Sequence, residues 1–213
     1  MERKIQKEYM QKKYASYLAE CLGTFTLSFV VSLSLLGNFP IAVPVAAAMT
    51  LGLLVYSIGH ISGTHINPAV TIGLLAIKKI SPRDAAAYIA AQVVGALLAM
   101  GLAHLLGVHL LDLPGNSLMI GAAEAIGTFF FTFGIAAVVS GRVPKALAGA
   151  IVGGSLLLGI ITAAASGSAG FLNPAVALAV GMLSPMYLVG PIVGSLLGFS
   201  VYTQLDKYSQ SIR

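Results

Sequence analysis

Two stretches decide the fold of this chain: Gly63-Thr64-His65-Ile66-Asn67-Pro68-Ala69 and Ala169-Gly170-Phe171-Leu172-Asn173-Pro174-Ala175. Each ends in an Asn-Pro-Ala triplet that begins an uncharged run of about ten residues, half of the roughly 20 that cross a bilayer. Asn caps helices because its side-chain oxygen accepts a hydrogen bond from a free N–H of the first turn, and Pro suits the first helical position because it lacks an N–H. The triplets therefore predict two capped half-helices, near residues 68–78 and 174–183.

The rest of the sequence is typical of an integral membrane protein. Of its 213 residues, 57% are hydrophobic and only 9% are charged, and the mean hydropathy is +0.91. Residues 21–77, 85–111 and 146–205 contain no Asp, Glu, Lys or Arg. These runs are too long and too rich in Gly for barrel strands, and they lack the alternating pattern. Because helices satisfy their own backbone groups in lipid, an all-α bundle is expected.

Six full spans are expected beside the two half-helices. They lie near residues 15–36, 41–60, 84–106, 118–140, 146–165 and 186–205. Turns at Gly37–Pro40 and Gly141–Pro144 separate the first span from the second and the fourth from the fifth. Ser81-Pro82 and Ser184-Pro185 start the span after each half-helix, with Ser as the cap and Pro in the first turn.

The basic residues gather in four segments, at 3–13, 78–83, 142–145 and 207–213. With six spans, all four segments lie on one side of the membrane, which by the positive-inside rule is the cytoplasm. The net charge of +5 thus reflects topology, and nucleic-acid binding is not expected. We expect a multi-pass protein of the cell membrane with both termini in the cytoplasm and a first span that is not cleaved as a signal peptide.

The chain also repeats itself. Ala19-Glu20-Cys21-Leu22-Gly23-Thr24-Phe25 resembles Ala123-Glu124-Ala125-Ile126-Gly127-Thr128-Phe129, 104 residues later, and the triplets lie 106 residues apart. Each half holds three spans, an odd number, so the second half enters the membrane from the opposite face. We therefore expect one membrane channel domain, residues 1–213, built from inverted repeats at about 15–106 and 118–205, whose half-helices meet near the middle.

The half-helix tips have a chemistry that suits a pore. The amide NH2 groups of Asn67 and Asn173 are free to face a lumen, and each helix start carries a partial charge of about +0.5 that repels cations. An ion there also loses its hydration, at an idealised cost of about 20 kcal/mol, whereas a neutral molecule avoids both costs. Irregular backbone survives at membrane depth where it lines a cavity. Its carbonyls are expected to line the lumen, from Gly63, Thr64, His65, Ile66, Ala169, Phe171 and Leu172. The sequence predicts a passive channel for water and other small neutral solutes.

These motifs resemble the major intrinsic protein family, the aquaporins and glycerol facilitators. The resemblance rests on Gly59-His60-Ile61-Ser62-Gly63, His65, Asn67-Pro68-Ala69-Val70 and the two Ala-Glu-x-x-Gly-Thr-Phe segments, and it covers nearly the whole chain. It implies a right-handed six-helix bundle, a homotetramer with one pore per subunit, and passive conduction of water or small neutral solutes. No cofactor is expected, no third ligand stands at a spacing suited to a metal, and no catalytic set of residues recurs.

The chain departs from the family that it resembles at the outer constriction. In most members an Arg follows the second triplet, where this chain has Val176. Counting back from the triplets gives Ala47, Ile161 and Gly170 for the other three positions, where water-selective members usually place an aromatic residue first and a His second. All four residues are small or aliphatic. A wider, uncharged constriction is expected to pass ammonia, hydrogen peroxide and small polyols such as glycerol besides water.

Other features leave the solute open. Ala177 replaces the Asp that glycerol facilitators carry, and the loop at 107–117 is short, which favours the water-type branch. The pair Tyr187-Leu188 gives a mixed signal, because Tyr is typical of water channels at its position and Leu is typical of glycerol channels.

Glu20 and Glu124 are carboxylates within the spans, at equivalent positions of the repeat. An intramembrane carboxylate is a functional candidate by default. The family resemblance implies that both accept hydrogen bonds from backbone N–H groups of the irregular loops. Proton handling stays open, because inverted repeats and broken helices also build secondary transporters for small polar solutes.

Overall fold

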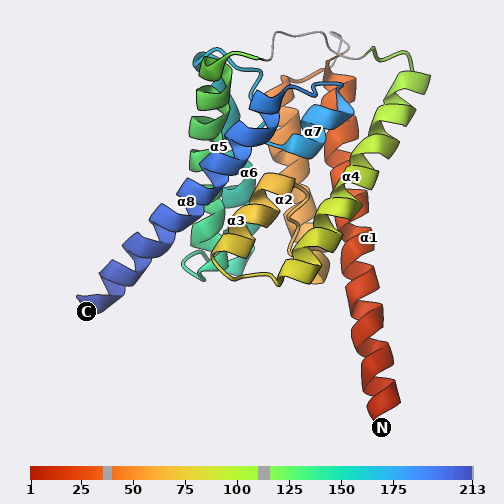
Figure 1. Ribbon diagram of the computed structural model, residues 1–213, viewed down its shortest axis with the longest axis vertical. Helices are drawn as coiled ribbons and strands as arrows, with labels where there is room; N and C mark the ends of the chain where they lie inside the picture. Colours follow the sequence, from red (N-terminus) through yellow and green to blue (C-terminus); the bar gives the residue numbers. More distant parts are fainter. Residues whose placement is uncertain (36–39, 110–115, 213) are drawn as a thin grey trace.

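The computed structural model describes residues 1–35, 40–109 and 116–212, apart from the side chains of residues 2, 4, 5 and 7. Within these residues every regular element is helical (Figure 1). The elements are α1 Glu2–Ser34, α2 Val43–Ser62, α3 Pro68–Ala76, α4 Pro82–Leu105, α5 Leu118–Val139, η1 Lys145–Leu147, α6 Ala148–Ala165, α7 Pro174–Ala179 and α8 Pro185–Ser211. Residues 37–39 of the predicted turn and residues 110–115 of the predicted loop lie outside the described residues.

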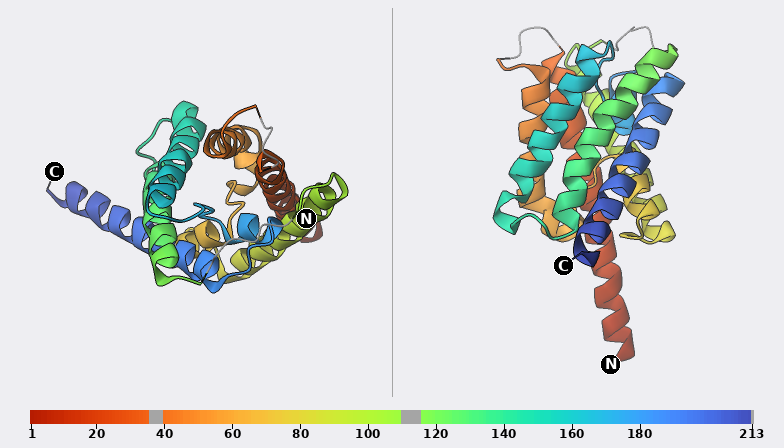
Figure 2. Two further views of the ribbon diagram at one scale, coloured as in Figure 1. Left: turned by 90° about the horizontal axis from the view of Figure 1, so that it is seen from above. Right: turned by 90° about the vertical axis from the view of Figure 1, so that its left-hand side faces the viewer.

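Six of the described helices are long and apolar enough to cross a membrane, which confirms the predicted all-α membrane fold. Their apolar parts are Glu8–Ser34, Val43–Ser62, Pro82–Leu105, Leu118–Val139, Lys145–Ala165 and Pro185–Ser211. Figure 2 shows these helices arranged in a ring, with the segments that lead into α3 and α7 passing through its middle. The two short helices contact each other, and both pack against α4 and α8.

The helix ends differ from the sequence expectations in two ways. α1 begins at Glu2 rather than near residue 15, and α8 continues to Ser211, so both helices project beyond the bundle at the same end (Figure 1). Hydropathy marks the part of a helix that lies in lipid and not its true end, and Glu, Lys and Gln favour continued helix in water. In contrast, α7 stops at Ala179, four residues early, because Gly181 takes the left-handed conformation that ends helices.

Glycines let the spans approach closely at repeat-equivalent crossings. A Cβ added at Gly95 of α4 would collide with the carbonyl oxygen of Cys21 in α1. A Cβ added at Gly194 of α8 would collide in the same way with the carbonyl oxygen of Ala125 in α5. Such backbone contact brings α1 against α4 and α5 against α8, and both α4 and α8 also contact the two half-helices.

The caps follow the predicted chemistry. Ser81 Oγ accepts a hydrogen bond from Asp84 N at 3.1 Å, and Ser184 Oγ accepts one from Met186 N at 3.2 Å. Pro82 and Pro185 each occupy the first helical position. Both full spans that follow a half-helix therefore start at the expected residue.

Candidate pore

The tips of the two half-helices are tied to each other by their asparagines. Asn67 Oδ1 accepts from Ala69 N at 2.8 Å, and Asn173 Oδ1 accepts from Ala175 N at 3.0 Å, so each side chain caps its own helix. Asn67 Nδ2 donates to Leu172 O at 2.9 Å.

The reciprocal bond runs from Asn173 Nδ2 to Ile66 O at 3.0 Å. Each amide carries two hydrogens and uses one in this exchange, which leaves one donor on Asn67 and one on Asn173. The exchange joins residues more than one hundred positions apart in the sequence, so the two short helices abut with their positive ends together.

Glu20 holds the irregular segment before α3. Its Oε1 atom accepts from Ser62 Oγ at 2.7 Å and from His65 N at 2.9 Å. Its Oε2 atom accepts from Ile66 N at 2.6 Å and from Gln92 Nε2 at 2.8 Å. The side chain is fully buried. Four donors on two oxygens satisfy an ionised carboxylate, so Glu20 fixes the backbone that leads to Asn67.

Glu124 holds the segment before α7 with an equivalent set of bonds. Its Oε1 atom accepts from Ser168 Oγ and, at 3.0 Å, from Phe171 N. Its Oε2 atom accepts from Leu172 N at 2.7 Å. The side chain is also fully buried. Both carboxylates thus accept hydrogen bonds from backbone N–H groups of the irregular loops.

These bonds hold a strained backbone. Ile66 has a φ of 39° and Leu172 a φ of 52°, in the left-handed region that residues with a side chain rarely adopt. Each such residue costs about 1–2 kcal/mol, so the surrounding contacts must enforce it. The left-handed conformation at Ile66 and Leu172 directs the carbonyl oxygen of each residue toward the asparagine of the opposite half-helix.

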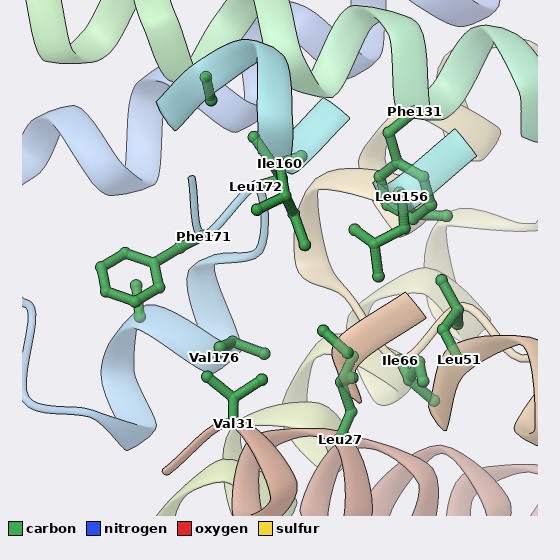
Figure 3. Packing of buried hydrophobic residues seen from close by; sticks show 14 of the residues in the cluster. Leu27, Val31, Leu51, Ile66, Phe131, Leu156, Ile160, Phe171, Leu172 and Val176 are labelled. Carbon is green, nitrogen blue, oxygen red and sulfur yellow. The ribbon is translucent and has the colours of Figure 1, made fainter. Parts of the chain in front are cut away.

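A cavity of about 190 Å³, the far cavity, lies at the end of the bundle opposite the chain termini. His65, Asn67 and Asn173 supply its polar side chains. Its apolar wall comes from α1, α2, α5, α6 and the segment around α7. All the residues labelled in Figure 3 except Leu172 belong to this wall: Leu27, Val31, Leu51, Ile66, Phe131, Leu156, Ile160, Phe171 and Val176.

A second cavity of about 280 Å³, the terminal cavity, lies at the end where the termini project. Gly63, Thr64 and His65 form one side of it, and Lys79 lies at its rim. His65 lines both cavities. Its Nδ1 atom lies 3.2 Å from Thr71 Oγ1, so the ring is fixed beside the half-helix tips, between the two cavities.

The structure places three of the four predicted constriction residues together and moves the fourth. Ala47, Gly170 and Val176 line the far cavity. Ile161 does not, because its side chain is 53% exposed on the outer surface of α6. Its neighbour Ile160 is 7% exposed and lines the cavity instead. Counting back through an irregular loop does not fix the rotation of the preceding helix, and one residue turns the side chain by about 100°.

The residues whose carbonyl oxygens were predicted to line the lumen as acceptors fall into four groups. Gly63 and Thr64 border the terminal cavity, and Ala169 and Phe171 border the far cavity. His65 borders both. The carbonyls of Ile66 and Leu172 accept the asparagine amides, as described above. The two irregular segments therefore approach the tips from opposite ends.

Sequence reasoning missed Gln92 of α4. It is fully buried, and its Nε2 atom donates to Glu20 Oε2 and, at 2.9 Å, to Thr71 Oγ1. It therefore ties α4 to α1 and to α3. A buried amide in the uncharged run 85–111 is the signal that could have found it, because polar side chains inside a span are usually bonded. Phe131 gives no such signal in an apolar helix.

Comparison with known proteins agrees with this geometry. The family model described as major intrinsic protein matches residues 7–202. Aquaporin AqpM from Methanothermobacter marburgensis is 34% identical over 211 residues, which cover 87% of this chain and 85% of that protein. Nodulin-26 from Glycine max is 34% identical over 206 residues, which cover 87% of this chain and 75% of that protein.

The X-ray structure of the aquaglyceroporin from Plasmodium falciparum has the same fold. It matches with a TM-score of 0.71 at 22% identity, over 91% of this chain and 95% of that one. Six spanning helices with two abutting half-helices thus define a helical membrane channel. The chain belongs to the major intrinsic protein family, whose members are channels and not enzymes.

Proposed function

We propose that this protein passively conducts water, ammonia, hydrogen peroxide and small polyols such as glycerol, past the paired tips of α3 and α7. The observation that carries the proposal is the exchange of hydrogen bonds between Asn67 and Asn173, located between two cavities that open toward opposite ends of the bundle. The relatives named as aquaporins and the structure named as an aquaglyceroporin support both water and polyols as solutes.

Exclusion of ions follows from the same geometry. The N-termini of α3 and α7 meet, and each contributes a partial positive charge of about +0.5 that repels cations. The remaining amide hydrogens of Asn67 and Asn173 donate to a passing oxygen or nitrogen atom, which a neutral solute offers without losing a hydration shell. Carbonyls of Gly63, Thr64, His65, Ala169 and Phe171 are the acceptors on either side.

Four residues set the selectivity among neutral solutes: Ala47, Ile160, Gly170 and Val176. Ile160 takes the place of Ile161, which the sequence predicted. All four are small or aliphatic and none is charged. Apart from His65, Asn67 and Asn173, the described residues that line the far cavity are apolar as well. A constriction of this kind sorts solutes by size and by the cost of removing their water, so relaxed selectivity is the expected result.

Coupled transport, the alternative that the repeat allows, has less support. Each oxygen of Glu20 already accepts two hydrogen bonds, and Glu124 accepts bonds from two backbone N–H groups. Adding a proton to either carboxylate would displace a donor that fixes the pore loop. Both groups are better suited to hold the backbone than to carry protons across the membrane.

The proposal includes the setting of the channel. One channel domain of two inverted repeats, at about 15–106 and 118–205, accounts for the matched bonds of Glu20 and Glu124. The channel lies in the cell membrane with its termini in the cytoplasm, which puts the basic segments on one side. Exposed apolar side chains along the outer faces suit lipid and neighbouring subunits of a homotetramer.

The experiment is stopped-flow light scattering on liposomes that contain the full-length protein, with water, glycerol, urea, ammonia and peroxide as a panel. The proposal predicts linear fluxes above those of protein-free liposomes, unchanged by an imposed proton gradient. Saturable uptake that depends on the gradient would establish the transporter instead.

A further inference from the structure

The terminal cavity carries a fixed charge that the far cavity lacks. Among the described residues that line it, Lys79 is the charged side chain. The described lining of the far cavity holds no Asp, Glu, Lys or Arg. In the proposed orientation, Lys79 stands at the cytoplasmic mouth of the pore.

The position of Lys79 is set by the turn that ends α3. Lys78 N donates to Leu75 O at 3.0 Å and Lys79 N donates to Leu74 O at 2.8 Å, with Lys78 at a φ of 61°. This is the Schellman arrangement, in which the left-handed position usually holds glycine. The turn ends the half-helix and brings Lys79 to the rim of the cavity.

The Lys79 ammonium reaches the C-terminal end of α5. Its Nζ atom donates to Val139 O at 3.4 Å. The three preceding carbonyls of α5, those of Ala136, Ala137 and Val138, accept from the backbone N–H groups of residues 140–142. Lys79 thus completes the last turn of a helix that begins some 20 residues away on the other side of the membrane.

Three helix C-termini, those of α2, α3 and α5, therefore lie at this mouth, because Gly63, which caps the end of α2, also lines the cavity. Each carries a partial charge of about −0.5, which attracts cations toward the pore. The unit positive charge of Lys79 offsets most of this combined negative charge. We propose that Lys79 is a specificity-determining residue that keeps cations away from the cytoplasmic mouth. This inference rests on the proposed channel function.

The equivalent turn at the far end has no such charge. Met182 N donates to Ala177 O at 2.8 Å and Gly181 N donates to Leu178 O at 3.0 Å, as Lys79 and Lys78 do after α3. Met182 therefore occupies the place of Lys79, and its side chain is buried. Val176 also lacks charge, and the described residues that line the far cavity include no Lys or Arg that could exclude cations, so we infer that the barrier at the mouths depends on Lys79.

The test compares Lys79→Gln with Lys78→Gln, a matched control, because Lys78 has the same charge and is exposed but does not line the cavity. Water flow and cation leak are measured on the same liposomes, the leak with a pH-sensitive dye and with potassium. We expect Lys79→Gln to raise the leak about threefold to tenfold at low salt, the range for one charge in a wet site. Lys79→Glu should raise it further, Lys79→Arg should restore the original value, and Lys78→Gln should change it less than twofold.

Salt separates an electrostatic role from a structural one. The Debye length falls from about 10 Å at 0.1 M to about 3 Å at 1 M, so the difference between Lys79→Gln and the original protein should nearly vanish at 1 M. Equal leak in these two proteins at low salt, with water flow intact, overturns the inference, as does an equal effect of Lys78→Gln. If neither the original protein nor any variant raises the water flow above that of protein-free liposomes, the proposed function is overturned, and the inference with it.

Discussion

The two halves of this molecule hold their half-helix tips alike but differ away from the centre. Glu20 and Glu124 accept from the same three groups, a serine hydroxyl and two successive backbone N–H groups. The first half adds Gln92 as a fourth donor to its carboxylate, and the corresponding residue of α8 is Pro191, which has no side-chain donor. The comparison indicates that the geometry next to the asparagines is tightly constrained, whereas the flanking residues are free to specialise.

The largest expected effect concerns the carboxylates. Glu20→Gln turns an NH2 group toward backbone N–H donors and leaves them unpaired, at a cost of about 2–4 kcal/mol in the free energy of unfolding. Glu124→Gln should cost less, because the new NH2 group can take the place of Oε2, which accepts from one donor, whereas each oxygen of Glu20 accepts from two. The order of stability is measured by thermal unfolding of the detergent-solubilised variants, monitored as the loss of the monodisperse peak in size-exclusion chromatography. A Glu124→Gln protein as unstable as Glu20→Gln would mean that Gln92 contributes nothing.

The next effect tests the uncharged far end. Val176→Arg places a bulky cation in the far cavity and makes the two ends of the pore alike in charge. We expect glycerol flux to fall by about tenfold, equivalent to about 1.4 kcal/mol, and water flux to fall less. Liposome swelling measures both. Val176→Ile is the control, since it adds bulk without charge. Unchanged glycerol and water rates in Val176→Arg would place the narrowest point elsewhere.

The smallest effect compares the turns that end the half-helices. Lys78 and Gly181 both take the left-handed conformation, which costs a lysine about 1 kcal/mol more than a glycine. Lys78→Gly should therefore stabilise the protein by up to about 1 kcal/mol, and Gly181→Ala should destabilise it by a similar amount. The unfolding temperatures of the two variants test this prediction. A shift of both temperatures in the same direction would contradict this account of the turns.

Much of the fold follows from local patterns in the sequence. Uncharged runs mark the six spans, and the triplets with their capping chemistry mark both half-helices at Asn67 and Asn173. α1 begins before the first predicted span and α8 continues past the last one, because hydropathy reports contact with lipid and not helix length. The second predicted half-helix, 174–183, was too long, because Gly181 takes the left-handed conformation that ends α7.

The site was harder to predict, because its finer features depend on partners distant in sequence. Gln92 donates a hydrogen bond to Glu20, 72 residues away in the sequence, and Lys79 donates one to Val139, 60 residues away. No local sequence pattern encodes such pairs. The choice between Ile160 and Ile161 depends on the rotation of α6, which is fixed by packing against α2 and α5. The positions of charges and helix caps are therefore predictable from the sequence. Whether an apolar side chain points into the pore or toward lipid is not.

The most direct test uses this neighbouring pair on α6. Ile160→Cys and Ile161→Cys are made in a Cys21→Ser background, which removes the single natural thiol. Water permeability is measured by stopped-flow before and after a small mercurial reagent. A passage through the far cavity predicts that the reagent blocks most of the water flow through Ile160→Cys and little of that through Ile161→Cys. Water flow that the reagent leaves unchanged in labelled Ile160→Cys, or blocks equally in both variants, would contradict a pore along this wall.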